Sequence, residues 1–131
     1  MGALLPGALT LVLANPERRY PLACREDPER LGVRLIGGPL AGASCVVFQT
    51  SANRSGEPAP ARFDDVDPAI VESVGLAIDG GALTGLPSTV VDLTEIESGG
   101  GWRLLRAGAV PRVELARLMT IAEVPVADTD A

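Results

Sequence analysis

The stretch Cys45-Val-Val-Phe-Gln-Thr-Ser-Ala-Asn-Arg-Ser-Gly-Glu-Pro58 joins an apolar run directly to a polar bend. The apolar half, residues 45–49, predicts a buried strand. The polar half, residues 50–58, gathers hydroxyls, an amide and backbone N–H groups in a sequence typical of a turn. Open α/β sheets bind ligands at such strand ends, so we expect one small polar ligand here. The alternative is an Asx or Ser turn whose side chains satisfy only their own backbone.

Hydrophobic patterning elsewhere in the chain predicts an α/β fold. Residues 31–36 alternate as a half-buried strand should, with Arg34 on the polar face. A glycine-rich hairpin turn is expected at residues 95–101. The expected strands are residues 9–13, 31–36, 45–49, 76–78, 90–93 and 102–106. A sheet with these strands and intervening helices is therefore predicted.

Two helices and a tail complete the prediction. Asp67 is a suitable N-cap, and Pro68 then occupies the first helical position. Pro111 begins a second helix with apolar residues near helical spacing. Residues 124–131 are acidic, and we expect them to form a disordered tail. Residues 1–123 are expected to form one domain.

The composition limits the classes of function. Hydrophobic residues make up 47% of the 131 residues and aromatic residues only 3%, so the core must be aliphatic. The net charge of −6 argues against a general binder of nucleic acid or anionic membranes, because such binding needs a basic surface. No apolar run reaches the length of a membrane span, and we expect a cytoplasmic protein.

The residue types exclude several kinds of catalysis. All eleven basic residues are arginine, and the chain has neither lysine nor histidine. Schiff-base chemistry, Ser-His-Asp triads and histidine metal sites are therefore excluded. Any anion must be bound by guanidinium or backbone N–H groups. Cys24 and Cys45 are too few and too far apart for a zinc motif and fit two reduced thiols, with a disulfide between them as the alternative.

Four segments, taken together, resemble one known family. They are Pro6-Gly-Ala-Leu-Thr10, Thr50-Ser-Ala-Asn-Arg-Ser-Gly-Glu-Pro58, Gly85-Leu-Pro-Ser-Thr-Val-Val-Asp92 and Leu104-Leu-Arg-Ala-Gly108. In order and approximate spacing they are similar to the YrdC-like domain of threonylcarbamoyl-AMP synthases. Asp79-Gly-Gly81 fits as well. The resemblance covers about residues 6–110, which correspond to only the C-terminal portion of the family's domain. It therefore implies an incomplete copy that lacks the family's Lys-x-Arg motif.

The resemblance implies a fold and a reaction. The fold is a twisted, open, mixed α/β sheet with flanking helices. The reaction joins L-threonine, bicarbonate and ATP into threonylcarbamoyl-AMP for the threonylcarbamoyladenosine modification of tRNA. Mg²⁺ accompanies the ATP. The expected partners are these small substrates and the downstream tRNA-modification machinery, with an RNA contact left open, no membrane and an unknown oligomeric state. No catalytic side chain and no protein-bound metal are expected.

The resemblance also assigns L-threonine to three residues. Arg34 matches a strand arginine that clamps the threonine carboxylate, although a solvent-facing strand arginine is the alternative. Gln49 would face threonine through its backbone. Ser88 matches the serine of a Ser-Thr pair that holds threonine, and a simple cap is its alternative. Thr10 is expected to be structural.

ATP is assigned to four further residues. Ser51 matches a serine near the phosphates, Asn53 organises the turn, and Ala59 lies at the nucleotide edge. Arg106 matches the arginine of Leu-Arg-x-Gly, expected on the phosphates, with a solvated strand end as the alternative. The chain departs from the family pattern at two places. Arg30 replaces a threonine that faces ATP in relatives, and residues 36–39 replace the family's Pro-x-His-Pro.

Two other functions stay open at this point. A non-catalytic, truncated YrdC-like module would bind nucleotide or RNA without turnover. A carbamoyl-transfer accessory domain, as found in hydrogenase maturation proteins, would be flanked by zinc-finger and acylphosphatase segments, which this sequence does not show. We expect little threonine-dependent pyrophosphate release from these 131 residues alone.

Overall fold

The computed structural model describes residues 5–24, 26–38, 41–42 and 45–127. The chain divides into two compact units, of which one comprises Met1–Cys45 with Ser88–Ala131 and the other Val46–Pro87. In the described residues, the first unit contains the sheet, two α-helices, the 3-10 helix η3 (Ile96–Ser98) and the buried core. No helix in the described residues is both long and apolar enough to cross a membrane.

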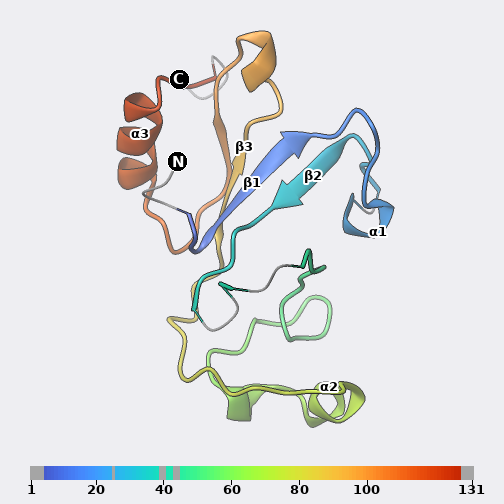
Figure 1. Ribbon diagram of the computed structural model, residues 1–131. Coiled ribbons are helices and arrows are strands. Elements are labelled where there is room, and N and C mark those ends of the chain that lie inside the picture. The colour runs from blue at the N-terminus through green and yellow to red at the C-terminus, as the bar shows by residue number, and fades with distance from the viewer. Residues whose placement is uncertain (1–4, 25, 39–40, 43–44, 128–131) are drawn as a thin grey trace. The chain divides into compact units, whose positions relative to one another are not determined.

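A four-stranded mixed sheet forms the centre of the first unit. Its order is β2-β1-β3-β4. The strands are β1 (Leu9–Ala14), β2 (Arg30–Val33), β3 (Thr89–Asp92) and β4 (Arg103–Arg106). β1 runs antiparallel to β2 (Figure 1) and parallel to β3, and β4 returns antiparallel to β3. The expected α/β fold with an open mixed sheet is confirmed.

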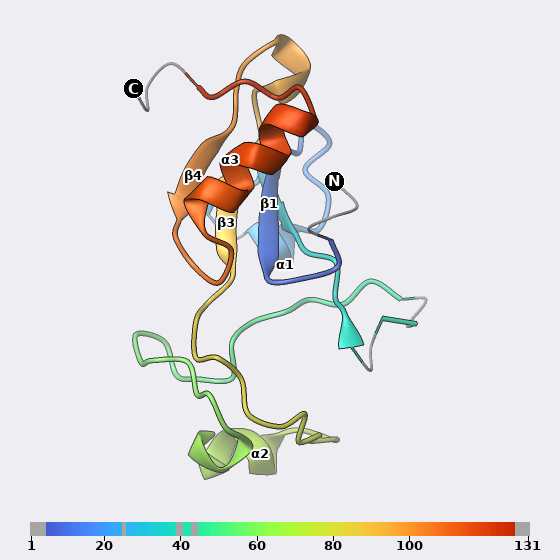
Figure 2. The ribbon, with the colours of Figure 1, turned by 90° about the vertical axis from the view of Figure 1, so that its left-hand side faces the viewer.

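Alternation along the strands gives this sheet one apolar and one polar face. Leu9 and Leu11 share a face with Val91, because β1 and β3 pair in register. The helix α3 (Arg112–Ile121) lies across this face (Figure 2) and buries Leu115 and Met119 against it. The buried core consists of Leu9, Leu11, Val91, Leu93, Trp102, Leu115 and Met119. Burial of such apolar surface is the main stabilising contribution to this unit.

The opposite face of the sheet carries polar side chains. Thr10 and Val12 point to it, because they alternate with the core leucines of β1. The pairing of Ala14 with Arg30 and of Val90 with Arg106 puts both arginines on the same face. This surface is named the open face below, and its residues are Thr10, Val12, Ala14, Arg30, Gly32, Ser88, Val90, Asp92, Arg103 and Arg106.

The connection between β1 and β2 is organised by one buried side chain. Asn15 is 5% exposed, and its Nδ2 donates to the carbonyls of Arg19 at 2.9 Å and Pro28 at 2.8 Å. Its Oδ1 accepts from the Arg19 backbone N–H at 3.1 Å. The segment contains a short helix, α1 (Pro21–Cys24), that the sequence did not predict. A buried polar group fully hydrogen-bonded in this way fixes the path of the loop.

The second unit, Val46–Pro87, has little regular structure. It contains a 3-10 helix, η2 (Phe63–Asp65), and the helix α2 (Pro68–Ser73). Asp67 caps α2 as predicted, because its side chain accepts from the Ala69 backbone N–H at 2.8 Å. No residue between 46 and 87 is buried. This unit therefore has no apolar core within the described residues.

Two expected strands are absent from the structure. Residues 45–49 and 76–78 form no strand, although their sequences are apolar. Val46, Phe48, Leu76 and Ile78 are all more than half exposed. A strand is stabilised by its ladder of hydrogen bonds and by burial of a face, and neither run has a paired neighbour. These two predictions are wrong.

The start of the expected tail is ordered against the sheet. The Trp102 backbone N–H donates to the Pro125 carbonyl at 2.8 Å, and Ala127 donates to the Trp102 carbonyl at 3.1 Å. A single parallel bridge thus joins Trp102 to Val126. Residues 124–127 are hydrogen-bonded, which differs from the expected fraying, whereas residues 128–131 lie outside the described residues.

Candidate functional site

Three of the predicted site residues gather at one end of the sheet. Arg34 follows the last residue of β2, Ser88 precedes the first residue of β3, and Arg106 ends β4. Because β2 and β4 run opposite to β1 and β3, all three positions lie at the end where β1 begins. Thr10, near the start of β1, lies between them. This group of four residues is named the β1-start cluster below.

Ser88 is the centre of the hydrogen bonds in the β1-start cluster. Arg106 donates from Nη2 to the Ser88 carbonyl at 2.9 Å and to Ser88 Oγ at 3.1 Å. Its Nε donates to the same carbonyl at 3.2 Å. Thr10 Oγ1 lies 3.0 Å from Ser88 Oγ. Ser88 thus contacts the guanidinium of Arg106, 18 residues further along the chain, and the hydroxyl of Thr10, 78 residues earlier.

Arg34 is held at the other side of the β1 start. Its Nε donates to the Gly7 carbonyl at 2.9 Å. The Gly7 backbone N–H in turn donates to the Leu35 carbonyl at 3.2 Å, and Thr89 donates to the Ala8 carbonyl at 3.0 Å. The loop that begins β1 therefore links Arg34 to the first residue of β3. The Arg34 side chain is otherwise exposed to solvent.

The open face is more basic than the chain as a whole. It carries Arg30, Arg103 and Arg106, and Arg34 follows directly after β2, whereas Asp92 is the one carboxylate on the described strands of this face. Asp92 is 4% exposed and pairs with Arg30. Neither Arg34 nor Arg106 forms an ion pair with a described carboxylate. Exposed guanidinium groups of this kind favour an anionic ligand.

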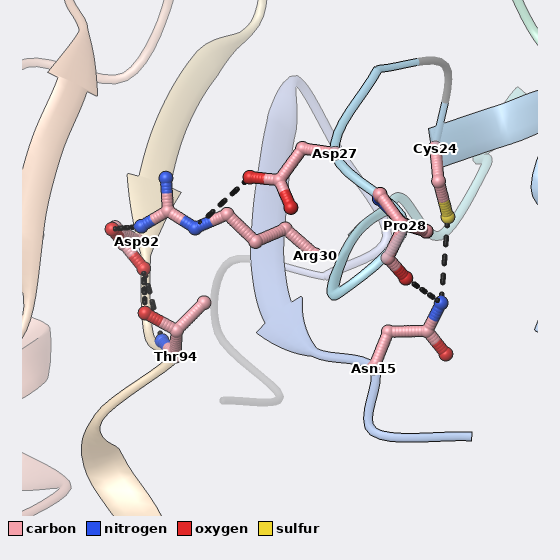
Figure 3. A network of polar contacts seen from close by, with 7 residues as sticks. All are labelled: Asn15, Cys24, Asp27, Pro28, Arg30, Asp92 and Thr94. Atoms are coloured by element: carbon pink, nitrogen blue, oxygen red, sulfur yellow. Dashed lines mark hydrogen bonds and ion pairs between the residues drawn. The ribbon is translucent and has the colours of Figure 1, made fainter. Parts of the chain in front are cut away.

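Arg30 has a structural partner rather than a place in the β1-start cluster. Figure 3 shows its guanidinium between Asp27 and Asp92, and the Asp27 contact is 3.8 Å long. Asp92 also accepts from the Thr94 backbone N–H at 2.9 Å and from Thr94 Oγ1 at 2.7 Å. The side chain of Arg30 is thus engaged at the far end of the sheet from Arg34.

These contacts set the pKa of Asp92. Burial, the largest single influence, raises the pKa of this carboxyl group, because it disfavours the charged form. The hydrogen bonds from Thr94 and the charges of Arg30 and Arg103 act in the opposite direction. Together they outweigh burial, so the pKa of Asp92 is lowered. Asp92 is therefore a charged structural group at neutral pH.

The other four predicted site residues belong to the second unit. Gln49, Ser51 and Ala59 are exposed, and Asn53 is half-buried. Asn53 Nδ2 donates to the carbonyls of Arg54 at 2.9 Å and Glu57 at 2.8 Å. Its amide nitrogen therefore closes the turn, as the sequence predicts.

Gly56 makes the same turn possible through its backbone. Its φ is +87°, a conformation that L side chains rarely adopt. The Glu57 backbone N–H closes the bend by donating to the Arg54 carbonyl at 3.1 Å. These hydrogen bonds are accounted for by the alternative in which residues 50–58 form a turn whose side chains satisfy only their own backbone.

Thr10 is the member of the cluster that the sequence did not assign to a site. Its only signal was its position at the end of the Pro6-Gly-Ala-Leu-Thr10 motif. Asp92 was likewise not predicted as the partner of Arg30. Among the described residues, no three His, Cys, Asp or Glu side chains are arranged to hold a metal ion.

The fold and the cluster define a class of protein: an α/β protein whose open sheet face presents hydroxyl and guanidinium groups at the start of its central strand. The model of the Sua5/YciO/YrdC family, described as "Telomere recombination", matches residues 1–108. The chain belongs to this family. The sequence resemblance to a YrdC-like domain is thereby confirmed.

Two curated relatives are similar to the chain over most of its length. One, from Methanocaldococcus jannaschii, is 28% identical over 116 residues, covering 86% of this chain and 53% of the relative. The other, from Mycobacterium leprae, is 32% identical over 128 residues, covering 91% and 54%. Both bear the name "Putative threonylcarbamoyl-AMP synthase". The chain thus spans about half the length of these relatives. A search of solved structures found no match.

Proposed function

We propose that this chain is a threonylcarbamoyl-AMP synthase-like protein acting on L-threonine, bicarbonate and ATP. The observation that carries the proposal is the β1-start cluster, where Ser88 lies at one end of the sheet with Arg34 and Arg106, neither of which forms an ion pair with a described carboxylate. Membership in the Sua5/YciO/YrdC family and the names of both relatives support the same reaction.

L-threonine is assigned to Arg34 and Ser88, and a backbone contribution from Gln49, which belongs to the other compact unit, stays a separate prediction. A guanidinium binds a carboxylate through two parallel hydrogen bonds when one of its edges presents two N–H groups side by side. Arg34 uses Nε for the Gly7 carbonyl, so its exposed terminal nitrogens remain to bind the threonine carboxylate. Ser88 contributes one hydroxyl to the same ligand.

ATP is assigned to Arg106, and the nucleotide roles of Ser51, Asn53 and Ala59 in the other compact unit stay separate predictions. Arg106 brings a positive charge that suits phosphate oxygens, and it is exposed. Asn53 acts by fixing the loop, because its amide nitrogen is engaged with two backbone carbonyls. Mg²⁺ enters with the triphosphate as part of the substrate and neutralises its charge.

The reaction needs positioning more than side-chain chemistry. The threonine amine attacks the carbon of bicarbonate to give a carbamate, and water leaves. A carbamate oxygen then attacks the α-phosphorus of ATP, and pyrophosphate leaves. The chain has no histidine, and none of these steps requires a protein nucleophile. The product would pass to the tRNA-modification machinery.

Binding without turnover is the second candidate function. The β1-start cluster is complete in this chain, whereas the chain spans about half the length of its curated relatives. A polar cluster on one unit is enough to bind an anionic ligand, but turnover needs all reacting groups held together. A nucleotide or an RNA phosphate would be the ligand of such a module.

One experiment separates the two candidates. Calorimetry measures the binding of L-threonine and of ATP with Mg²⁺, and a coupled assay measures pyrophosphate release with and without threonine and bicarbonate. Threonine-dependent release supports the synthase, and binding without release supports the binding module. The matched control is Ser88→Ala, which removes one hydroxyl from the cluster. If neither L-threonine nor ATP binds, the synthase and a nucleotide-binding module are both refuted.

A further inference from the structure

We propose that Thr10 is a positioning residue that sets the direction of the Ser88 hydroxyl proton and thereby prepares Ser88 to donate to an anionic oxygen of L-threonine. The identity of the ligand as L-threonine rests on the proposed function, whereas the contact between Thr10 and Ser88 does not. The juxtaposition that carries it is the Thr10 Oγ1 to Ser88 Oγ distance of 3.0 Å beside the Arg106 Nη2 to Ser88 Oγ distance of 3.1 Å.

The number of protons on these groups decides how the hydrogen bonds run. A serine hydroxyl has one proton and two lone pairs, whereas a guanidinium can only donate. Arg106 therefore occupies one lone pair of Ser88 Oγ. Thr10 either donates to the second lone pair or accepts the Ser88 proton. In the first case Ser88 offers its proton outward, and in the second it offers a lone pair.

The charge of the surroundings selects the first case when ligand is bound. Arg34 and Arg106 lie at this end of the sheet without a described carboxylate partner, so the ligand oxygen that meets Ser88 is anionic. An anionic oxygen only accepts, so Ser88 must donate to it. Because the single proton of Ser88 then goes to the ligand, Thr10 must donate its own proton to the remaining lone pair of Ser88 Oγ.

The methyl group of Thr10 explains why threonine suits this position. Branching at Cβ restricts the first side-chain torsion to few rotamers. A Cβ placed on Gly32 of the neighbouring strand would lie 3.7 Å from Thr10 Cγ2, so the methyl group faces Gly32 at ordinary van der Waals range. With the methyl group held there, Oγ1 points to Ser88.

Three variants of the full chain test this hydrogen-bond relay, in which Thr10 donates to Ser88 and Ser88 donates to the ligand. Thr10→Val keeps the shape but removes the hydroxyl, Thr10→Ser keeps the hydroxyl, and Ser88→Ala removes the group that Thr10 acts through. We expect Thr10→Val to weaken L-threonine binding about fivefold, as for one lost hydrogen bond. Thr10→Ser should stay within about twofold of wild type. In the Ser88→Ala background, Thr10→Val should have no further effect.

A ligand-free measurement separates this inference from the proposed function. The ¹³Cβ signal of Ser88 and the side-chain ¹⁵N signals of Arg106 should shift in Thr10→Val and return in Thr10→Ser. If wild type does not bind L-threonine, the proposed function fails. These NMR signals alone then show whether Thr10 orients the Ser88 hydroxyl.

The outcomes that overturn the relay are equally specific. Signals unchanged by Thr10→Val would overturn it, and so would equal losses of L-threonine affinity in Thr10→Val and Thr10→Ser. Independent, multiplying effects of Thr10→Val and Ser88→Ala would do the same. Circular dichroism and the unfolding midpoint report whether each variant folds. If Thr10→Val does not fold, Thr10→Ala takes its place in every comparison.

Discussion

Arg30 in β2 pairs with Asp92 in β3 across the intervening strand β1, so one ion pair joins two strands that are not neighbours (Figure 3). Asp92 is 4% exposed, and its two hydrogen bonds from Thr94 satisfy the oxygen that does not face Arg30. A buried carboxylate with this many partners holds the polar end of the sheet together.

Asp92→Asn is expected to reduce the free energy of unfolding at pH 7 by about 1–3 kcal/mol, because Arg30 and Thr94 lose a charged acceptor that is itself buried. The pKa of Asp92 is lowered from its ordinary 3.8, so its stabilisation is present above that value. It is lost as pH falls through the lowered pKa. In urea unfolding, the difference in unfolding free energy between wild type and variant should therefore be full near pH 7 and shrink as the pH falls below 3.8.

Asp27→Asn is the matched control for this variant. Asp27 lies 3.8 Å from Arg30 Nε, but its side chain is 56% exposed. An exposed pair contributes at most about 1 kcal/mol. A difference between Asp92→Asn and wild type that is the same at both ends of the pH range would show that the charge of Asp92 is not what stabilises the sheet.

Arg34→Ala and Arg106→Ala are expected to have opposite selectivity for the two proposed ligands. Arg34→Ala should weaken L-threonine binding about tenfold and ATP binding less, because a charged hydrogen bond to the carboxylate is lost. Arg106→Ala should weaken ATP binding more than L-threonine binding. Calorimetry with each ligand checks both, and Arg117→Ala on the exposed part of α3 is the control. Equal shifts for both ligands in Arg34→Ala would mean that Arg34 is not the carboxylate clamp.

Gly101→Ala is expected to destabilise the first unit by about 1–3 kcal/mol, as overpacking does. A Cβ on Gly101 would lie 2.4 Å from the backbone of Val126 and Ala127, which cannot both move without breaking their pairing with Trp102. Gly80→Ala is the control, because nothing lies within 4 Å of its added Cβ and its φ is not positive. Urea unfolding followed by Trp102 fluorescence measures both. Equal unfolding midpoints for the two variants would show that a Cβ at position 101 does not disturb the pairing with Val126 and Ala127.

Hydrogen exchange is expected to differ sharply between the two units. Amides of β1 and β3 should be the slowest to exchange, because they lie in the middle of the sheet beside the buried core. Amides of residues 46–87 should exchange much faster, since no side chain in that range is buried. Mass spectrometry of peptides from both units checks this. Comparable protection in the two units would contradict the difference in packing described above.

Local sequence patterns were a good guide where burial and pairing agreed with them. The apolar run at residues 9–13 and the alternation in residues 31–36 predicted strands, which exist as β1 and, at Arg30–Val33, as β2. The caps at Asp67 and Pro111 predicted where α2 and α3 begin. The same reasoning failed at residues 45–49 and 76–78, because an apolar run forms a strand only when a neighbour completes its hydrogen bonds.

The candidate site was predicted in part. Arg34, Ser88 and Arg106 were assigned through a family resemblance, and the strand register brings them to one end of the sheet. Gln49, Ser51, Asn53 and Ala59 belong to the other compact unit, and their ligand roles stay predictions. Thr10 was expected to be structural. Its contact with Ser88 was not predicted, because nothing in a linear sequence shows that it meets a residue 78 positions away.

By itself the sequence determined the α/β class, the absence of lysine and histidine chemistry, and the positions of the strands that carry the core. These follow from residue type and short-range periodicity, which act over a few residues. The tertiary structure decided which strands pair, that Arg30 neutralises Asp92, and that Thr10 and Arg106 both contact Ser88. Such contacts depend on strand register, and register is set by burial of whole faces across the sheet.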